Sequence, residues 1–391
     1  MKRRSFIAAA TAATSAIAAI PATPALAVYG DLPLGGSVTI GVVGPFTGES
    51  LRAGEQIANG VRAATDDANR SRGTLDKAYL MRTFDDQNLL ASGLVNAEFA
   101  CDDANVVAVI GHLSGRITEG ALQTYVTNKM PIICPASTYD RLTAHGYGNL
   151  IRLPTKDSVE GRLAARYINA TIKPKTIAVL YQDGDYGADV AAGFQDQMLG
   201  DKVTSNAVAF AWDKPDFAGV AKATLEKAPE IVYLAGVTKD MAPIVPKLRA
   251  LGYKGPFFAS QGFFDAATIA KLGPQAEGLT ISCSMPPLAL APGAFRIKND
   301  YERRYGPMSP IAAFSYAATQ IVLAVVKRTG ANDRIAVQRG LGFSSSFDTI
   351  IGPLSFASDG DPQNPNTFFY TIKDGAWRYV TAANPSSFIV K

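Results

Sequence analysis

Histidine and cysteine are scarce in this 391-residue chain, which holds two of the first and three of the second. Two histidines argue against a histidine-based metal centre, and three widely spaced cysteines cannot build a disulfide-rich scaffold. Cys101, Cys134 and Cys283 lie in apolar stretches and are predicted to be buried free thiols, although a Cys101–Cys134 bridge stays open for an oxidising compartment. We therefore expect neither a metal nor a cofactor.

The common motifs of catalysis and nucleotide binding are also missing. There is no G-x-x-x-x-G-K-[ST] loop, no G-x-G-x-x-G turn after the first strand and no G-x-S-x-G elbow. His112 follows an apolar run and is predicted to be a structural residue. Together with Ser114, His112 is the only local candidate for an amide-hydrolysing site. An amide-hydrolysing enzyme therefore remains an alternative to a protein without catalytic residues.

The chain has little excess of charge of either sign, because 38 Lys and Arg residues nearly balance 34 Asp and Glu residues. Three of the positive charges are Lys2, Arg3 and Arg4, so the rest of the chain carries a net charge near +1. No basic field is left to attract nucleic acid or a membrane surface. A hydrophobic content of 47% with 18% charged residues argues against disorder.

Residues 1–27 have the three parts of a signal peptide. A positive start is followed by an apolar stretch over 6–20, and Ala25-Leu26-Ala27 places small residues before a cleavage site. The run Arg3-Arg4-Ser5-Phe6-Ile7 also resembles a twin-arginine motif, so both the Sec and the twin-arginine export routes stay open. No cysteine lies near the cleavage site to carry a lipid, and no later stretch is expected to span a membrane. The mature protein is expected outside the cytoplasm.

Beyond the signal peptide, strand and helix patterns alternate. The continuous apolar run Val106–Ile110 is typical of a strand covered on both faces, and apolar residues at helical spacing follow the first strand over 54–70. The same alternation restarts near residue 156, and the last third adds two helices, 295–305 and 311–329, before short strands. The pattern predicts an α/β fold with two similar, doubly wound halves.

Five loops follow predicted strands, where open α/β sheets bind ligands. In the first half these loops are residues 44–48, 111–116 and 135–138; in the second half they are residues 183–187 and 260–262. Ser114, Ser137 and Thr138 offer hydroxyl groups, and a helix beginning near Gly115 offers backbone N–H groups to an anion. Taken singly, these hydroxyls could equally be helix caps and turn formers.

The sequence of these loops resembles a known family. The stretches 109–114, 134–138 and 142–147, with Gly44-Pro45-Phe46-Thr47-Gly48, Asp185-Tyr186-Gly187, Ala276–Leu279 and Ile351–Leu354, are similar to the leucine/isoleucine/valine-binding proteins of bacterial ABC importers. These landmarks occur in order over nearly the whole mature chain. The resemblance implies a periplasmic, monomeric protein that captures a small solute and delivers it to a membrane permease.

The resemblance implies a type I periplasmic binding protein, in which three crossings join two lobes that close on the solute. Lobe 1 is expected at 28–155 plus 285–357, and lobe 2 at 156–284 plus 358–391. The crossings should fall near 154–157, 284–287 and 356–359.

By the same resemblance, Ala136 and Thr138 hold a solute carboxylate and ammonium, with Ser137 between them. Ser114 and Gly115 occupy the other carboxylate positions, and Tyr186 closes over the solute from the second lobe.

Two departures from the family pattern bear on the solute. Gln261 stands where the amino-acid binders place a glutamate that neutralises the ammonium, and Gly115 replaces a serine. Arg52 and Arg116 lie in loops expected to face the cleft, where they could bind a second anion or simply be exposed. Because a buried cation without a counter-charge is unfavourable, we expect a solute without an ammonium, such as an organic acid or amide. A ligand-sensing subunit of a signalling receptor is the alternative use of the same fold.

Overall fold

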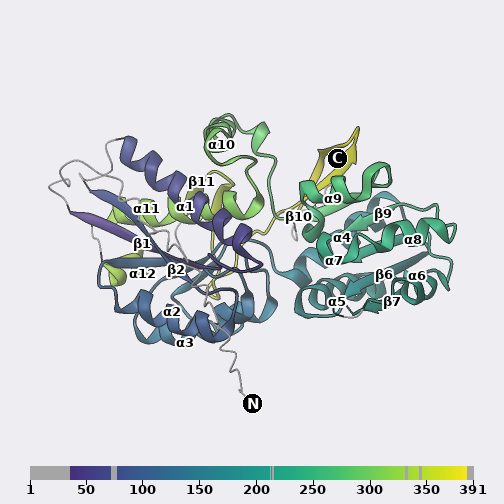
Figure 1. Ribbon diagram of the computed structural model, residues 1–391, viewed down its shortest axis with the longest axis horizontal. Coiled ribbons are helices and arrows are strands. Elements are labelled where there is room, and N and C mark those ends of the chain that lie inside the picture. Colours follow the sequence, from purple (N-terminus) through teal and green to yellow (C-terminus); the bar gives the residue numbers. More distant parts are fainter. Residues whose placement is uncertain are drawn as a thin grey trace, which may run out of the picture. The chain divides into compact units, whose positions relative to one another are not determined.

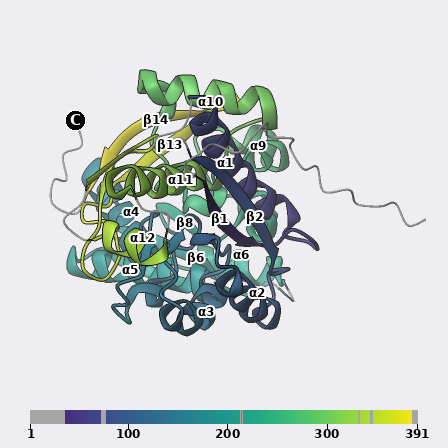
Figure 2. The same cartoon turned by 90° about the vertical axis from the view of Figure 1, so that its left-hand side faces the viewer.

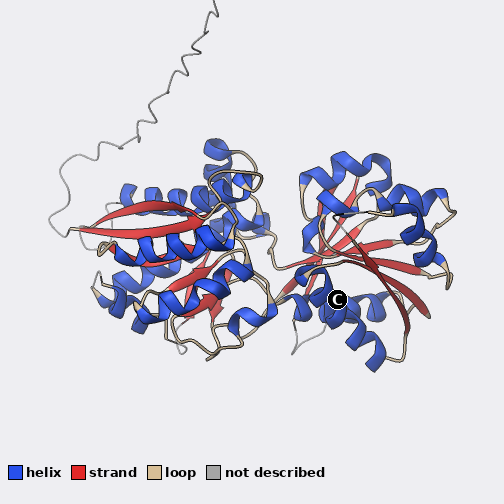
Figure 3. Ribbon diagram, turned by 60° about the horizontal axis from the view of Figure 1, so that its bottom comes forward, coloured by secondary structure: helices blue, strands red, loops and turns tan. Residues whose placement is uncertain are grey.

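The structure, a computed structural model, describes residues 36–384 except 72–76, 212, 214, 331–332 and 343–345. The predicted signal peptide lies outside the described residues. The described chain forms two mainly parallel sheets with helices packed against them, together with a two-stranded ribbon (Figures 1 and 3). The predicted α/β fold with two lobes is confirmed.

The sheet of the first lobe has the strand order β2-β1-β3-β4-β5, and all its pairings are parallel. Every residue of β3 is buried, as the apolar run predicts. Helices α2 and α3 lie side by side in both views (Figures 1 and 2). The elements are β1 Ser37–Gly44, α1 Leu51–Arg70, β2 Ala78–Asp85, α2 Leu90–Asp102, β3 Val106–Gly111, α3 Gly115–Thr127, β4 Ile132–Cys134, the 3-10 turn η2 Asp140–Thr143 and β5 Leu150–Arg152.

The second lobe repeats this architecture and adds a C-terminal hairpin. Its strand order is β14-β13-β10-β9-β8-β6-β7, in which β13 pairs antiparallel with β10 and the strands from β10 to β7 are parallel. The elements are α4 Asp157–Thr171, β6 Thr176–Gln182, α5 Asp185–Gly200, β7 Thr204–Phe210, α6 Phe217–Leu225, β8 Ile231–Ala235, α7 Thr238–Met241, α8 Ile244–Ala250, β9 Phe257–Ala259, η3 Gln261–Phe263, α9 Ala266–Leu272, η4 Gly273–Ala276, β10 Thr280–Cys283, β13 Thr367–Lys373 and β14 Ala376–Ala383.

One predicted helix is divided. The sequence pattern predicts a single helix over 239–251, whereas the structure has α7 and α8 with Pro243 between them. Proline lacks the backbone N–H that a continuous helix needs and clashes with the preceding turn. The chain therefore turns at this point and begins a new helix.

The segment between β10 and β13 returns to the first lobe. It forms η5 Leu288–Leu290, α10 Pro292–Tyr305, α11 Pro310–Thr329, α12 Arg334–Gly340 and the ribbon β11 Ser346–Thr349 with β12 Gly352–Ser355. Contrary to expectation, α11 is long and apolar enough to cross a membrane by length and composition, yet 67% of its most apolar window is buried inside the protein. The helix packs against α1 and other elements. A helix that is buried on several sides carries apolar residues on most of its surface, which explains this composition.

Hydrogen bonds tie together the segments that connect the two lobes. The Thr155 N–H donates to Ser284 Oγ over 3.0 Å, which links the first connection to the second. Arg152, with no exposed surface, donates Nε to Asp361 Oδ1 over 2.9 Å, which links the first to the third. The positions of the three crossings and the lobe boundaries stay predictions.

All three cysteines are buried free thiols, which confirms that prediction. Burial raises the pKa of Cys134 to about 12 and that of Cys101 to about 11. Both thiols therefore stay protonated, and they pack as apolar groups in the core of the first lobe.

Candidate functional site

A hollow of about 370 Å³ lies between loops of the two lobes, and we call it the inter-lobe pocket. Seven of the nine predicted ligand-binding residues line it. The lining consists of Leu113, Ser114, Gly115, Arg116, Ala136, Ser137, Thr138 and Tyr139 from the first lobe and Asp157, Gln182, Asp183, Gly184, Asp185, Tyr186, Gly187 and Val237 from the second. The carboxyl ends of parallel strands thus supply most of the wall, as expected for this fold class.

Two helices begin at the pocket, one from each lobe. Ser114 precedes α3 and Gly184 precedes α5, and neither helix has a side-chain cap at its first turn. The uncapped N–H groups and the helix dipoles give both walls partial positive charge, which favours an anionic group of a solute. Gly184 has φ +145°, a backbone conformation that other residues rarely adopt.

The wall around α3 is closely packed. The Ser137 side chain is buried, and its hydroxyl has no hydrogen-bond partner within the described protein. A Cβ atom at Gly115 would lie 2.4 Å from Tyr139 Cβ and 2.6 Å from Ser137 Oγ. Glycine at 115 therefore leaves the Ser137 hydroxyl free for a solute, and a serine at 115 would not fit without a shift of its neighbours.

An ion pair joins the lobes at the pocket. Arg116 on α3 donates Nη2 to Asp185 Oδ1 over 2.7 Å and Nε to the other carboxylate oxygen. Arg116 holds the pKa of Asp185 below its usual value, chiefly through the hydrogen bond. The guanidinium of Arg116, which was a candidate for binding a second anion, is thus paired with the carboxylate of Asp185.

Tyr186 is held from the second lobe at the same pocket. Its hydroxyl donates to Ser260 Oγ over 3.0 Å and accepts the Gly262 N–H over 3.0 Å. These bonds position the ring before any solute arrives. They also connect the pocket wall to the predicted loop 260–262.

Two buried acids of α4 lie at and behind the pocket. Asp157 lines the pocket with 1% of its surface exposed, and burial raises its pKa well above the usual value although the Thr138 hydroxyl donates to it. Glu160 has no exposed surface, and burial raises its pKa to about 8. Its Oε1 accepts the Gln261 N–H over 2.8 Å and the Ser282 hydroxyl over 2.9 Å. One oxygen of each acid, Asp157 Oδ1 and Glu160 Oε2, has no hydrogen-bond partner among the residues that the structure describes.

The other two predicted site residues do not line the pocket. Gln261 is half-buried in η3 and meets Glu160 through its backbone. Arg52 is exposed in the first turn of α1. The structure therefore does not bring these residues together with the other seven.

His112 is a structural residue. It is fully buried, with Nδ1 2.7 Å from Asp86 Oδ2 and Nε2 2.9 Å from the Tyr125 hydroxyl. Since both ring nitrogens are engaged, His112 has no free position to take a proton from Ser114.

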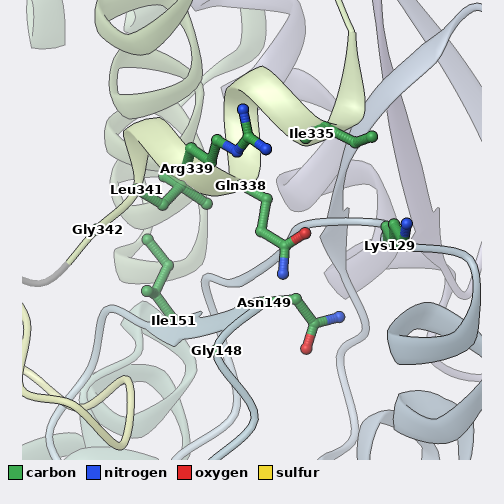
Figure 4. Close-up of a pocket in the computed structure, with 9 residues that line it drawn as sticks. All are labelled: Lys129, Gly148, Asn149, Ile151, Ile335, Gln338, Arg339, Leu341 and Gly342. Atoms are coloured by element: carbon green, nitrogen blue, oxygen red, sulfur yellow. The ribbon is translucent and has the colours of Figure 1, made fainter.

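A second hollow of about 460 Å³ lies within the first lobe, between β5 and α12 (Figure 4). The Gln338 side chain extends from α12 toward Asn149 at its edge (Figure 4). Its lining includes no residue of the second lobe, so closure of the two lobes would not enclose it.

Comparison with known proteins decides the family. A family model described as "Periplasmic binding protein" matches residues 37–376. The chain belongs to this family. It is a family of solute-binding proteins rather than enzymes, and its relatives include the leucine/isoleucine/valine-binding proteins.

Three individual comparisons show how close the relationship is. The Leu/Ile/Val-binding protein homolog 1 of Brucella suis is 28% identical over 342 residues, which covers 87% of this chain and 91% of that protein. A leucine-binding protein of Thermotoga maritima superposes with a TM-score of 0.79 at 22% identity, covering 89% of this chain and 99% of that one. A solute-binding protein of Rhodopseudomonas palustris in complex with 3,4-dihydroxybenzoic acid superposes with a TM-score of 0.77 at 17% identity, covering 89% and 97%.

Sequence reasoning missed Asp157 and the carboxylate pairing of Arg116. An acid in the first turn of a helix is common because it complements the helix dipole, so Asp157 does not stand out in the sequence. The only signal is its position, at the end of the first predicted crossing. Arg116 and Asp185 are 69 positions apart and meet only through the arrangement of the lobes.

Proposed function

We propose that this protein is the periplasmic solute-binding component of an ABC importer. It captures an amino acid-like solute or a small organic acid or amide between its lobes and delivers it to the membrane permease, with no covalent step. The observation that carries this proposal is the inter-lobe pocket, whose walls come from helix N-termini of both lobes and include the unpartnered Ser137 hydroxyl.

The mechanism is capture followed by hinge closure. A solute with an anionic group binds first to the N–H groups of α3 and to Ser137, because these donors lie together on the first lobe. Contacts to Tyr186 and to the start of α5 then form only when the second lobe approaches. Closure is driven by those additional contacts, since a solute shifts a conformational equilibrium only by its differential affinity for the two states.

The test is to identify the solute and to observe the motion. Native mass spectrometry of the protein, purified without denaturation, should show a bound small molecule that is released by organic solvent and identified by its fragments. Small-angle X-ray scattering should show a smaller radius of gyration after that molecule is added to stripped protein. Scattering curves that stay the same at saturating solute would contradict hinge closure, and turnover of the solute would contradict a transport role.

The importer is distinguished from a receptor by the partner. A solute-loaded protein should stimulate ATP hydrolysis by its permease–ATPase complex in proteoliposomes more strongly than the variant Ser137→Ala, which removes a pocket hydroxyl. Binding to a membrane receptor kinase or chemoreceptor with no effect on any importer would support the signalling alternative instead.

A further inference from the structure

The hollow between β5 and α12 contains a buried amide whose hydrogen bonding is incomplete. Asn149 lines this hollow, and only 3% of the residue is exposed. Its Nδ2 donates to the Met130 carbonyl over 2.9 Å, whereas its Oδ1 has no hydrogen-bond partner among the described residues. Because the bond to Met130 fixes the orientation of the amide, the group that Asn149 still requires is a hydrogen-bond donor. Buried side-chain oxygens nearly always have such a partner.

Asn149 stands at a position where the fold favours an apolar side chain. It directly precedes β5 and continues the strand pairing, because its carbonyl accepts the Ile132 N–H over 2.8 Å. Successive side chains of a strand point to opposite faces, so Asn149 shares a face with Ile151. Ile151 belongs to the core cluster that includes residues of α11 and α12, whereas Leu150 packs on the other face. A polar group on the α12 face is unfavourable unless a partner binds it.

The facing wall of the hollow belongs to α12. Ile335, Gln338 and Arg339 are spaced by three and four positions, so they share one face of this helix and line the hollow together. The Gln338 side chain extends from α12 toward β5 (Figure 4), where its amide can both donate and accept. Behind this face, a Cβ atom at Gly340 would lie 2.3 Å from Val325 Cγ1 of α11. Close packing against α11 therefore holds the wall in place.

The hollow carries positive charge without a counter-charge. Lys129, in the turn before β4, and Arg339 both line it, and none of its described lining residues is acidic. Neither side chain forms an ion pair within the described part of the chain. The apolar part of the lining consists of Ile151, Ile335 and Leu341. Two free cations, an apolar surface and an unpaired acceptor thus meet in one place.

We propose that this hollow is a second ligand site, separate from the inter-lobe pocket, and that it takes a small organic anion with an apolar body and a hydroxyl or N–H group. The anionic group lies toward Lys129 and Arg339, and the donor binds Asn149 Oδ1. The volume of about 460 Å³ is within the range of small-molecule sites. Because only the first lobe lines the hollow, this ligand binds without closure of the lobes, and the inference goes beyond the proposed function.

Water is the alternative occupant of the hollow. A water molecule can donate to Asn149 Oδ1, and ordered water often satisfies buried groups in this way. It neither balances the charge of Lys129 and Arg339 nor gains from contact with Ile151 and Leu341. The experiment therefore has to distinguish an organic anion from water alone.

The experiment uses three probes that differ in one group at a time. 4-Hydroxyphenylacetate has the anion, the apolar ring and the donor, phenylacetate lacks the hydroxyl, and 2-(4-hydroxyphenyl)ethanol lacks the charge. NMR spectra of the protein labelled at the isoleucine δ1 methyl groups follow each titration, because Ile151 and Ile335 report on the hollow and Ile117, in the first turn of α3, reports on the inter-lobe pocket. We expect 4-hydroxyphenylacetate to shift the Ile151 and Ile335 signals saturably, and each of the other two probes to bind there about tenfold more weakly.

A pair of charge reversals locates the site independently. Arg339→Glu should weaken binding of 4-hydroxyphenylacetate at least about tenfold, because repulsion replaces attraction at the hollow. Arg296→Glu on α10 is the matched control, since Arg296 does not line the hollow, and it should retain the affinity. Both arginines are exposed, so both variants should fold, and their thermal melting curves check this. The comparison of probes on the unmodified protein needs no variant.

The outcomes are separate from those that test the proposed function. The inference is overturned if no probe shifts the Ile151 and Ile335 signals saturably at millimolar concentration, which would leave water as the occupant. Equal affinity for phenylacetate and 4-hydroxyphenylacetate, or unchanged affinity in Arg339→Glu, also overturns it. Shifts confined to the Ile117 signal would place the probes in the inter-lobe pocket and have the same consequence. None of these results decides whether a solute is captured between the lobes, which scattering and native mass spectrometry test.

Discussion

Glu160 should make the stability of this protein fall as the pH rises from 5 to 8. Its carboxyl group is fully buried, and burial raises its pKa from an ordinary 4.5 to about 8. An acid whose pKa is raised in the folded state stays protonated there at pH values at which it already ionises in the unfolded chain. Its ionisation therefore favours the unfolded state, and the folded protein is most stable where the acid is protonated in both states. The contribution is therefore complete below about pH 4.5 and is lost progressively as the pH rises toward 8.

The size of the effect follows from that pKa difference. Each pKa unit corresponds to about 1.4 kcal/mol, and between pH 5 and pH 8 the expected loss is about 3 kcal/mol. Glu160→Gln removes the titration and keeps an acceptor oxygen for the Gln261 N–H and the Ser282 hydroxyl. Relative to the unmodified protein, this variant should gain about 3 kcal/mol between the two pH values.

The assay is urea unfolding followed by circular dichroism at pH 5 and pH 8. Taking the difference between variant and unmodified protein at each pH cancels the titration of groups that do not interact with Glu160. Glu98→Gln, an exposed change of the same kind on α2, is the control and should show no such gain. If the curves for Glu160→Gln and the unmodified protein keep a constant separation within about 0.5 kcal/mol across this range, Glu160 does not titrate as argued.

Three further predictions concern the crossings and the pocket. Asp361→Asn should lower the free energy of unfolding by about 3 kcal/mol, because buried Arg152 loses its charged partner; a loss below 1 kcal/mol in urea unfolding would argue against that role. Gly115→Ser should weaken solute binding at least about tenfold in calorimetry, because the new Cβ collides with the packed wall; unchanged affinity would show that the wall yields. Arg116→Gln should weaken solute binding by no more than about fivefold and reduce its salt dependence, since the pair with Asp185 is largely exposed; an effect of a hundredfold would mean that Arg116 contacts the solute itself.

Much of the fold could be predicted because its signals are local. The apolar run that became β3 and the helical spacing of α1 each depend on a short stretch of chain. The loops of the pocket could be predicted as well, because parallel strands present their carboxyl ends at one edge. Pro243, which divides the predicted helix, is also a local signal. The apolar pattern on both sides of it nevertheless predicted one continuous helix.

The remaining features depend on contacts between distant segments. Whether Arg116 meets a solute or Asp185 is decided by the approach of two lobes, which no local pattern encodes. Asp157 and Glu160 read as ordinary acids at the start of a helix, and their burial follows from how α4 packs on β10 and the crossings. Gln261 illustrates the converse, because no residue of the predicted loop 260–262 lines the pocket.

The antiparallel pairing of β13 with β10 has a consequence for biosynthesis. The ribosome makes β10 before α10, α11 and α12, and only afterwards the hairpin that covers its edge. During that interval the nascent second lobe exposes an unpaired strand, which invites association with other chains. A translocase that accepts only folded cargo would have to wait until β13 and β14 have emerged, whereas a route that threads unfolded chains moves the same interval to the far side of the membrane.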